Sequence, residues 1–63
     1  MYFVLYRDDH GFWRWTYRAP SHEVICASAT SYTTKRVALH SIYLVRAGAP
    51  AARVYDEGPQ PLL

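Results

Sequence analysis

The stretch that decides the fold of this chain is Phe12-Trp13-Arg14-Trp15-Thr16-Tyr17-Arg18. Successive side chains of a β-strand point to opposite faces, so Trp13, Trp15 and Tyr17 would share one face. Both arginines of the stretch then fall on the other face. The pattern predicts a strand that turns an aromatic face toward a core and a polar face toward solvent.

A first strand is predicted over residues 2–7, which are rich in β-branched and aromatic side chains. Two registers are possible across the turn Asp8-Asp9-His10-Gly11 that follows it. A four-residue loop would set an arginine opposite Leu5. A three-residue loop, with Gly11 in the left-handed conformation of a G1 bulge, sets Trp15 opposite Leu5 and gathers the aromatic side chains on one face. We predict the second register.

The rest of the chain predicts three further elements: a strand over residues 23–28, a helix over about 35–47 and a short fourth strand over 51–55. Either Thr33 or Thr34 suits the N-cap of the helix. Gly48 would end the helix in a left-handed conformation and Pro50 would prevent its resumption.

The predicted helix has one apolar stripe, which we expect to lie on the sheet. The stripe comprises Ala38, Leu39, Ile42 and Val45. Val37 and Leu44 fall beside this stripe, on a flank that water would reach in a two-layer monomer. We therefore predict that Val37 and Leu44 contact a partner.

The length of 63 residues allows one domain, predicted over residues 2–56, with a flexible tail over 57–63. Hydrophobic burial and ordering cost each come to about 95 kcal/mol for a chain of this size, so the monomer is marginal. A lone Cys26 forms no internal disulfide, and the three histidines show no zinc-binding spacing. Self-association into a homodimer is therefore the favoured source of stability.

The formal net charge of +2 is too small to require nucleic acid or a membrane surface as a partner. The opening apolar run is too short for a signal peptide, and no stretch is long enough to cross a bilayer. These observations predict a soluble cytoplasmic protein that has no membrane partner.

The chain resembles the YegP-like family of small proteins of unknown function. The resemblance is carried by the segments Phe3-Val4-Leu5-Tyr6, Trp13-Arg14-Trp15, Tyr32-Thr33-Thr34-Lys35 and Val54-Tyr55-Asp56. It implies a unit of three strands, a helix and a strand, two copies of which share one sheet and exchange their C-terminal strands. Arg53, Val54 and Tyr55 would then join the sheet of a second copy. The chain departs from the family at Ser21-His22, where members commonly place Asn-Gly in a two-residue type I′ turn.

The predicted fold class is therefore α+β: a three-stranded antiparallel meander, one helix packed on it and a C-terminal strand swapped in a homodimer. The alternative is a closed monomer whose fourth strand joins its own sheet.

No residue pattern predicts a catalytic site, a cofactor or a metal. Cys26 could serve as a nucleophile, but the middle of a strand favours a buried core position for it. Asp8 and Asp9 could form a carboxylate pair, yet a hairpin tip favours Asp because its side chain bonds nearby backbone amides.

One surface remains as a possible ligand-binding face. It carries Tyr2, Tyr6, Arg14 and Arg18 on the outer side of the first two strands, where Tyr6 beside Arg14 and Tyr2 beside Arg18 suggest cation–π pairs. Arginines interleaved with aromatic residues are typical of single-stranded nucleic-acid binders. We predict a small dimeric structural or interaction module without catalysis, with weak single-stranded nucleic-acid binding through this face as the alternative.

Overall fold

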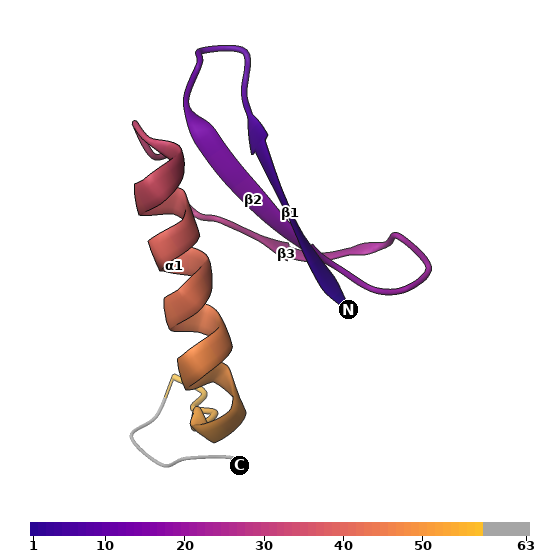
Figure 1. The fold of residues 1–63 in the computed structure, drawn as a ribbon. Coiled ribbons are helices and arrows are strands. Elements are labelled where there is room, and N and C mark those ends of the chain that lie inside the picture. Colours follow the sequence, from indigo (N-terminus) through magenta and orange to yellow (C-terminus); the bar gives the residue numbers. More distant parts are fainter. Residues whose placement is uncertain (58–63) are drawn as a thin grey trace.

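The protein is described by a computed structural model that covers residues 1–57 in detail (Figure 1). Its elements are β1 (Tyr2–Arg7), β2 (Trp13–Arg18), β3 (Val24–Ala27), α1 (Lys35–Gly48) and a turn of 3₁₀ helix (Ala49–Ala51). The strands form one antiparallel sheet in the order β1-β2-β3. The predicted α+β class, a meander with one helix packed on it, is confirmed.

The first hairpin has the predicted register. The Gly11 amide donates to the Asp8 carbonyl at 3.0 Å, and the Asp8 amide donates to the Phe12 carbonyl at 2.8 Å. Gly11 has a φ of 81°, the left-handed conformation that a glycine adopts without steric cost. Leu5 consequently pairs with Trp15. The turn thus places the aromatic side chains of β1 and β2 on the face that α1 covers.

The second hairpin has the same kind of turn, built on a residue less suited to it. The His22 amide donates to the Ala19 carbonyl at 2.8 Å, and the Ala19 amide donates to the Glu23 carbonyl at 2.9 Å. His22 takes the left-handed position with a φ of 74°. The two-residue turn of the family pattern is therefore replaced by a three-residue loop, Pro20-Ser21-His22, closed by a strained histidine.

A bulge follows immediately on β3. Tyr17 pairs with Cys26, but Arg18 pairs with Val24, which leaves Ile25 as the extra residue. An extra residue in one strand bends it and increases its local twist. Ile25 and Cys26 both line the space between the sheet and α1.

Helix α1 begins as predicted and ends differently. Thr34 has extended φ and ψ angles of −128° and 151°, and its hydroxyl accepts from the Val37 amide at 3.2 Å. The predicted left-handed stop at Gly48 is wrong, because Gly48 is right-handed with φ −94° and ψ −31°. Pro50 lies in the first turn of the 3₁₀ helix, where its missing amide costs no hydrogen bond.

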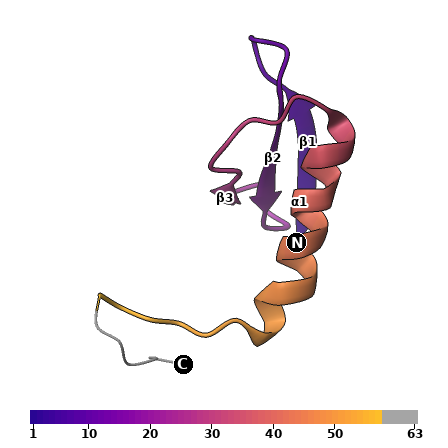
Figure 2. The same ribbon diagram turned by 90° about the vertical axis from the view of Figure 1, so that its left-hand side faces the viewer.

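Helix and sheet are in close contact over only part of their length (Figures 1 and 2). The buried apolar side chains within residues 1–57 are Trp15, Ala38 and Ile42. Leu39 and Val45 belong to the stripe predicted to lie on the sheet, yet both are exposed. Ala38 and Ile42 of the predicted stripe are covered, whereas Leu39 and Val45 line an open space between the sheet and α1.

Residues 52–56 form no helix and lead away from the sheet as an extended segment (Figure 2). Within residues 1–57 the sheet has three strands, so the segment predicted as a fourth strand does not close on its own sheet. The first residue of that segment, Ala51, lies in the 3₁₀ helix instead. The predicted flexible tail over 57–63 lies outside the described residues except for Glu57.

Candidate functional site

The outer face of the sheet carries the four residues singled out from the sequence. Tyr2 is registered opposite Arg18, and Tyr6 is opposite Arg14. Helix α1 packs on the other face of the sheet (Figures 1 and 2). The alternation along β1 and β2 is therefore sufficient to bring these four side chains to one surface. We call this surface the outer face.

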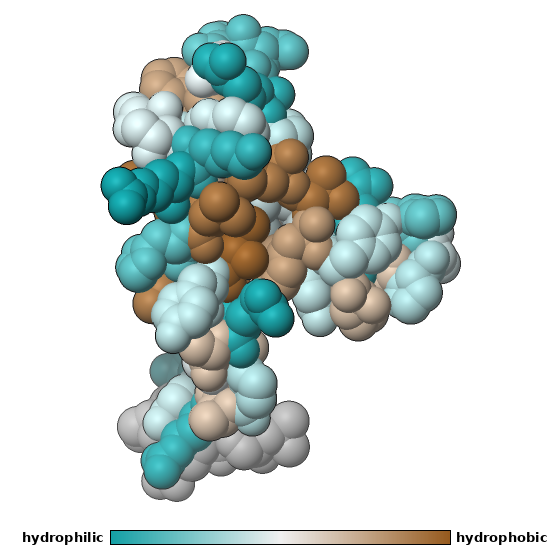
Figure 3. Space-filling view, viewed as in Figure 1, coloured by the Kyte–Doolittle hydropathy of each residue, from teal (hydrophilic) through white to brown (hydrophobic). Residues whose placement is uncertain are grey.

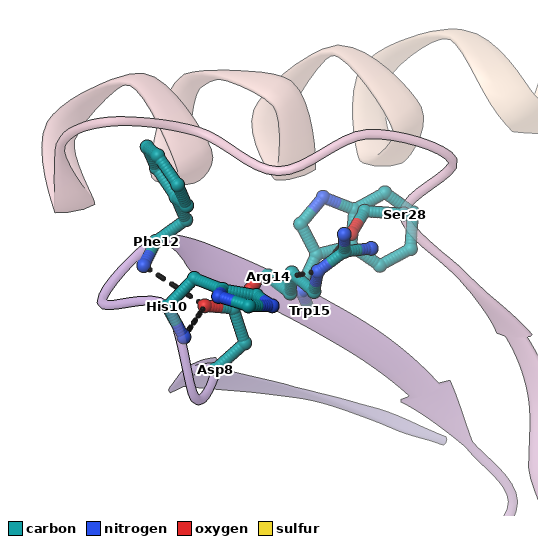
Figure 4. Close-up of polar contacts among 6 residues, drawn as sticks. All are labelled: Asp8, His10, Phe12, Arg14, Trp15 and Ser28. Carbon is teal, nitrogen blue, oxygen red and sulfur yellow. Dashed lines mark hydrogen bonds and ion pairs between the residues drawn. The ribbon is translucent and has the colours of Figure 1, made fainter.

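Arg14 is held by the first turn (Figure 4). Its Nε donates to Asp8 Oδ2 at 2.9 Å, while Asp8 Oδ1 accepts from the His10 amide at 2.9 Å and from the Phe12 amide at 3.0 Å. The hydrogen bond from Arg14 is the largest influence and lowers the pKa of the Asp8 carboxyl below its ordinary value. Loss of solvation opposes this shift, and the hydrogen bonds from the Phe12 and His10 amides add to it. Asp8 thus anchors the turn, as its position at a hairpin tip favours, and it neutralises Arg14.

Arg18 has partners of another kind. Its Nε donates to Thr16 Oγ1 at 3.1 Å and its Nη1 to the His22 carbonyl at 3.4 Å, both of which are uncharged acceptors. Within residues 1–57 the Arg14–Asp8 pair is the single salt bridge, so Arg18 has no carboxylate partner there. The Tyr2 hydroxyl bonds His22 Nδ1 at 2.5 Å, and the two rings meet edge to face.

The cation–π pairs expected on the outer face are not formed. Among the described residues such contacts occur on the inner face, where Arg7 and Lys35 lie 5.7 Å and 5.5 Å from the ring centroid of Trp13. The expectation was wrong because a hydrogen bond to Asp8 holds the guanidinium of Arg14, and bonds to Thr16 and the His22 carbonyl hold that of Arg18. A cation with a directional acceptor in reach prefers it to an exposed ring.

A polar cluster that the sequence did not reveal joins the sheet to α1. The Trp15 indole N–H donates to Ser41 Oγ at 2.8 Å, and that hydroxyl donates to the Ala38 carbonyl at 2.7 Å. The hydroxyl of Ser41 lowers the pKa of the Tyr32 phenol below its ordinary value, with further contributions from the Thr30 hydroxyl and the Trp15 indole. The available signal was the tryptophan itself, because a buried indole N–H needs an acceptor.

An open groove lies between the sheet and α1 (Figure 3). It has a volume of about 940 Å³ and a largely apolar lining, which includes Phe3, Leu5, Tyr17, Ile25, Leu39 and Val45. Cys26 lies on its wall and is exposed, so the predicted burial of this cysteine is wrong. The prediction failed because it rested on the central position of Cys26 in its strand, whereas residues 1–57 leave open the groove that Cys26 faces.

The residues predicted to contact a partner lie in two places. Val37 and Leu44 are on α1 and are 49% and 56% exposed, while Val54 and Tyr55 lie in the extended segment and are 42% and 53% exposed. Arg53, beside them, is exposed as well. Each site therefore presents uncovered apolar surface.

Residues 1–57 also lack two features that mark other classes of protein. No group of three or more His, Cys, Asp or Glu side chains there is placed to hold a metal ion. No helix in the same part of the chain is both long and apolar enough to cross a membrane.

Comparison with known proteins gives the chain its family. A family model described as a domain of unknown function, DUF1508, matches residues 8–56. The chain belongs to the DUF1508 family. It is also similar to the UPF0339 protein NMB1088 of Neisseria meningitidis serogroup B, with 37% identity over 56 residues that cover 89% of this chain and 98% of the relative. The UPF0339 protein NMA1193/NMA1859 of serogroup A of the same species is similar to the same extent.

The DUF1508 match confirms the resemblance to small domains of unknown function that the sequence suggested. It spans β2, β3, α1 and the first turn, so Asp8 and the aromatic strand β2 both lie within it. Neither the description of the family nor the names of the relatives mentions an enzymatic activity.

Proposed function

We propose that this DUF1508 domain is a small cytoplasmic structural or interaction module that acts as a homodimer without catalysis. The observation that carries the proposal is the open apolar groove between the sheet and α1. A groove of about 940 Å³ is large for a chain of this size, and one of its walls, β3, is exposed along its whole length. Contiguous apolar surface of this kind marks an interaction site in soluble proteins.

The small core supports the same proposal. Three apolar side chains within residues 1–57 are buried, namely Trp15, Ala38 and Ile42. Domains of this length that lack disulfides and metals commonly gain the missing stability by association. A second copy that covered Ile25 on β3 and Leu44 on α1 would turn exposed apolar side chains into core.

The extended segment supplies a mechanism for association. Residues 52–57 run away from their own sheet, and Val54 and Tyr55 are of the types favoured in strands. The outer edges of β1 and β3 have no partner strand within residues 1–57. We infer that Arg53 to Tyr55 of one copy pair with a sheet edge of the other, which would also protect an edge that otherwise invites aggregation.

Light scattering after size-exclusion chromatography tests this function. At micromolar concentration we expect twice the 7.3 kDa of a single chain. Val54→Asp and Leu44→Asp should each shift the mass toward the monomer, because both place a charge in a surface that the proposal buries. Tyr43→Asp likewise places a new negative charge on α1, at a 63% exposed position about 100° around the helix from Leu44; it is the matched control and should leave the dimer intact. A wild-type mass equal to one chain would overturn the proposal.

A further inference from the structure

The outer face of the sheet is not covered by another element, yet hydrogen bonds hold its two arginines in place. Helix α1 covers the opposite face, and within residues 1–57 no helix or strand lies over this one (Figures 1 and 2). We propose that the outer face binds single-stranded nucleic acid, with a phosphate at Arg18 and a base stacked on Tyr6. This activity is separate from the proposed dimer and does not depend on it.

Arg18 has the properties of a phosphate ligand. It lies along the sheet, held by Thr16 Oγ1 and the His22 carbonyl, which fix its position without neutralising its charge. A guanidinium has five N–H donors, and these two contacts use two of them. The donors that remain can form the paired hydrogen bonds by which arginine recognises phosphate oxygens.

Arg14 differs from Arg18 in this respect. Its charge is compensated by Asp8 at 2.9 Å, which makes the Arg14 end of the face close to neutral. Arg14 and Arg18 lie four residues apart on the same face of β2. The charge of Arg14 is compensated by Asp8 in the turn, whereas that of Arg18 is not. The uncompensated positive charge of the outer face is therefore that of Arg18, at the second hairpin, where the His22 carbonyl accepts from its guanidinium. Glu23 follows His22 in the sequence and is exposed, and it forms no salt bridge with Arg18.

The tyrosines supply the contacts that favour a single strand. Tyr6 is 39% exposed, so part of its ring is open to a ligand. The ring of Tyr2 is fixed in place by the hydrogen bond and the edge-to-face contact with His22. Tyr2 and Tyr6 are four residues apart on one strand, or about 13 Å. Aromatic rings stack on the faces of unpaired bases, which a duplex does not offer.

The charge available sets the expected strength. One uncompensated arginine per chain neutralises about one phosphate, and the logarithm of the single-strand binding constant then falls with the logarithm of the salt concentration at a slope of about −0.7 per chain. Binding should therefore be weak, and salt should affect it modestly. A steep salt dependence would mean a different, more basic surface.

Fluorescence anisotropy with a labelled oligo-dT of about 12 nucleotides, at about 50 mM salt, tests the proposal. Arg18→Gln should weaken binding about fivefold and flatten the salt slope by about 0.7. Tyr6→Leu should weaken binding about fivefold, the lower limit for loss of one stacked base. The matched controls are Arg36→Gln and Tyr43→Leu, which make the same changes at exposed positions of α1 and should bind as the wild type does.

Several results would contradict nucleic-acid binding by the outer face. Absence of wild-type binding at this salt concentration would overturn the proposal, and so would equal losses in Arg18→Gln and Arg36→Gln, which would indicate general charge attraction. Equal competition by a duplex of the same length would overturn the stacking of Tyr6. Circular dichroism confirms that each variant is folded, and light scattering on the same samples reports the dimer separately.

Discussion

The two ends of the helix–sheet interface are built from similar residues but reach different outcomes. At the end nearer the first hairpin, which we call the closed end, α1 rests on β2, and Trp15, Ala38 and Ile42 are buried around the Ser41 hydroxyl. At the other end, the open end, β3 is exposed and α1 passes beyond the strands. Both ends carry apolar side chains. Whether such a side chain is buried therefore depends on how many elements of the chain are near enough to cover it.

Hydrogen bonds reinforce the closed end. Trp13 and Tyr32 exchange backbone hydrogen bonds at 2.7 Å and 2.8 Å, which ties the segment before α1 to the edge of β2. The Ser28 amide adds a bond of 2.9 Å to the Trp15 carbonyl. The open end has no comparable tie between β3 and α1 within residues 1–57, and the bulge at Ile25 bends β3 there. The described part of the chain therefore packs one end of the helix–sheet interface and leaves the other end open.

The largest effect on stability should come from shortening a buried side chain at the closed end. Ile42→Ala removes most of a buried side chain and leaves a cavity, so we expect a loss of about 2–5 kcal/mol in the free energy of unfolding. Leu44→Ala, two residues later on the same helix but 56% exposed, should cost the single chain less than about 0.5 kcal/mol. Urea denaturation followed by tryptophan fluorescence measures both. Equal losses would mean that Ile42 at the closed end is packed no more tightly than an exposed side chain of the same helix.

Removing the acceptor of Trp15 should have the next largest effect. Ser41→Ala leaves the indole N–H of Trp15, a side chain that is 6% exposed, without its 2.8 Å partner, which costs about 1–3 kcal/mol. Ser21→Ala, at the exposed tip of the second hairpin, is the control and should change stability by less than about 0.5 kcal/mol. If thermal denaturation gave both variants the same midpoint, the hydroxyl would contribute nothing to the closed end.

The contrast between the ends also explains what could be predicted from the sequence. Gly11 and Thr34 were informative because their effect is local: a glycine suits a left-handed φ, and a threonine accepts from an amide three residues later. Strand alternation was likewise sufficient to place Arg14 and Arg18 on one face. All three signals act over a few residues and do not depend on what surrounds them.

The predictions that failed depended on distant parts of the molecule. Cys26 is exposed because no element within residues 1–57 covers the groove, and a central strand position does not reveal that. Gly48 tolerates a right-handed conformation as readily as a left-handed one, so it did not have to end the helix. The partners of Arg18 were missed because the three-residue loop that presents the His22 carbonyl to it was not foreseen.

His22 offers a smaller test at the open end. An L-residue with a φ of 74° is strained, and glycine relieves the strain. His22→Gly and His22→Ala both lose the bond to the Tyr2 hydroxyl, so that loss cancels when the two variants are compared. The glycine variant should be more stable than the alanine variant by about 1 kcal/mol. A more stable alanine variant would show that this turn stores no strain.

The smallest effect concerns the pH dependence that Asp8 contributes to the closed end. Its pKa is lowered in the folded state by Arg14 and by two backbone amides, so its carboxylate stabilises the fold at pH values above the ordinary Asp pKa of about 4. This contribution is lost as the pH falls through the lowered pKa, because protonation then weakens the bonds to Arg14 and the amides. The difference in melting temperature between the wild type and Asp8→Asn should therefore shrink as the pH is reduced from neutrality to below 4. Asp9→Asn, the neighbouring change in the same turn, should keep the wild-type dependence; if it behaved as Asp8→Asn does, the effect would belong to the net charge of the hairpin and not to the anchor.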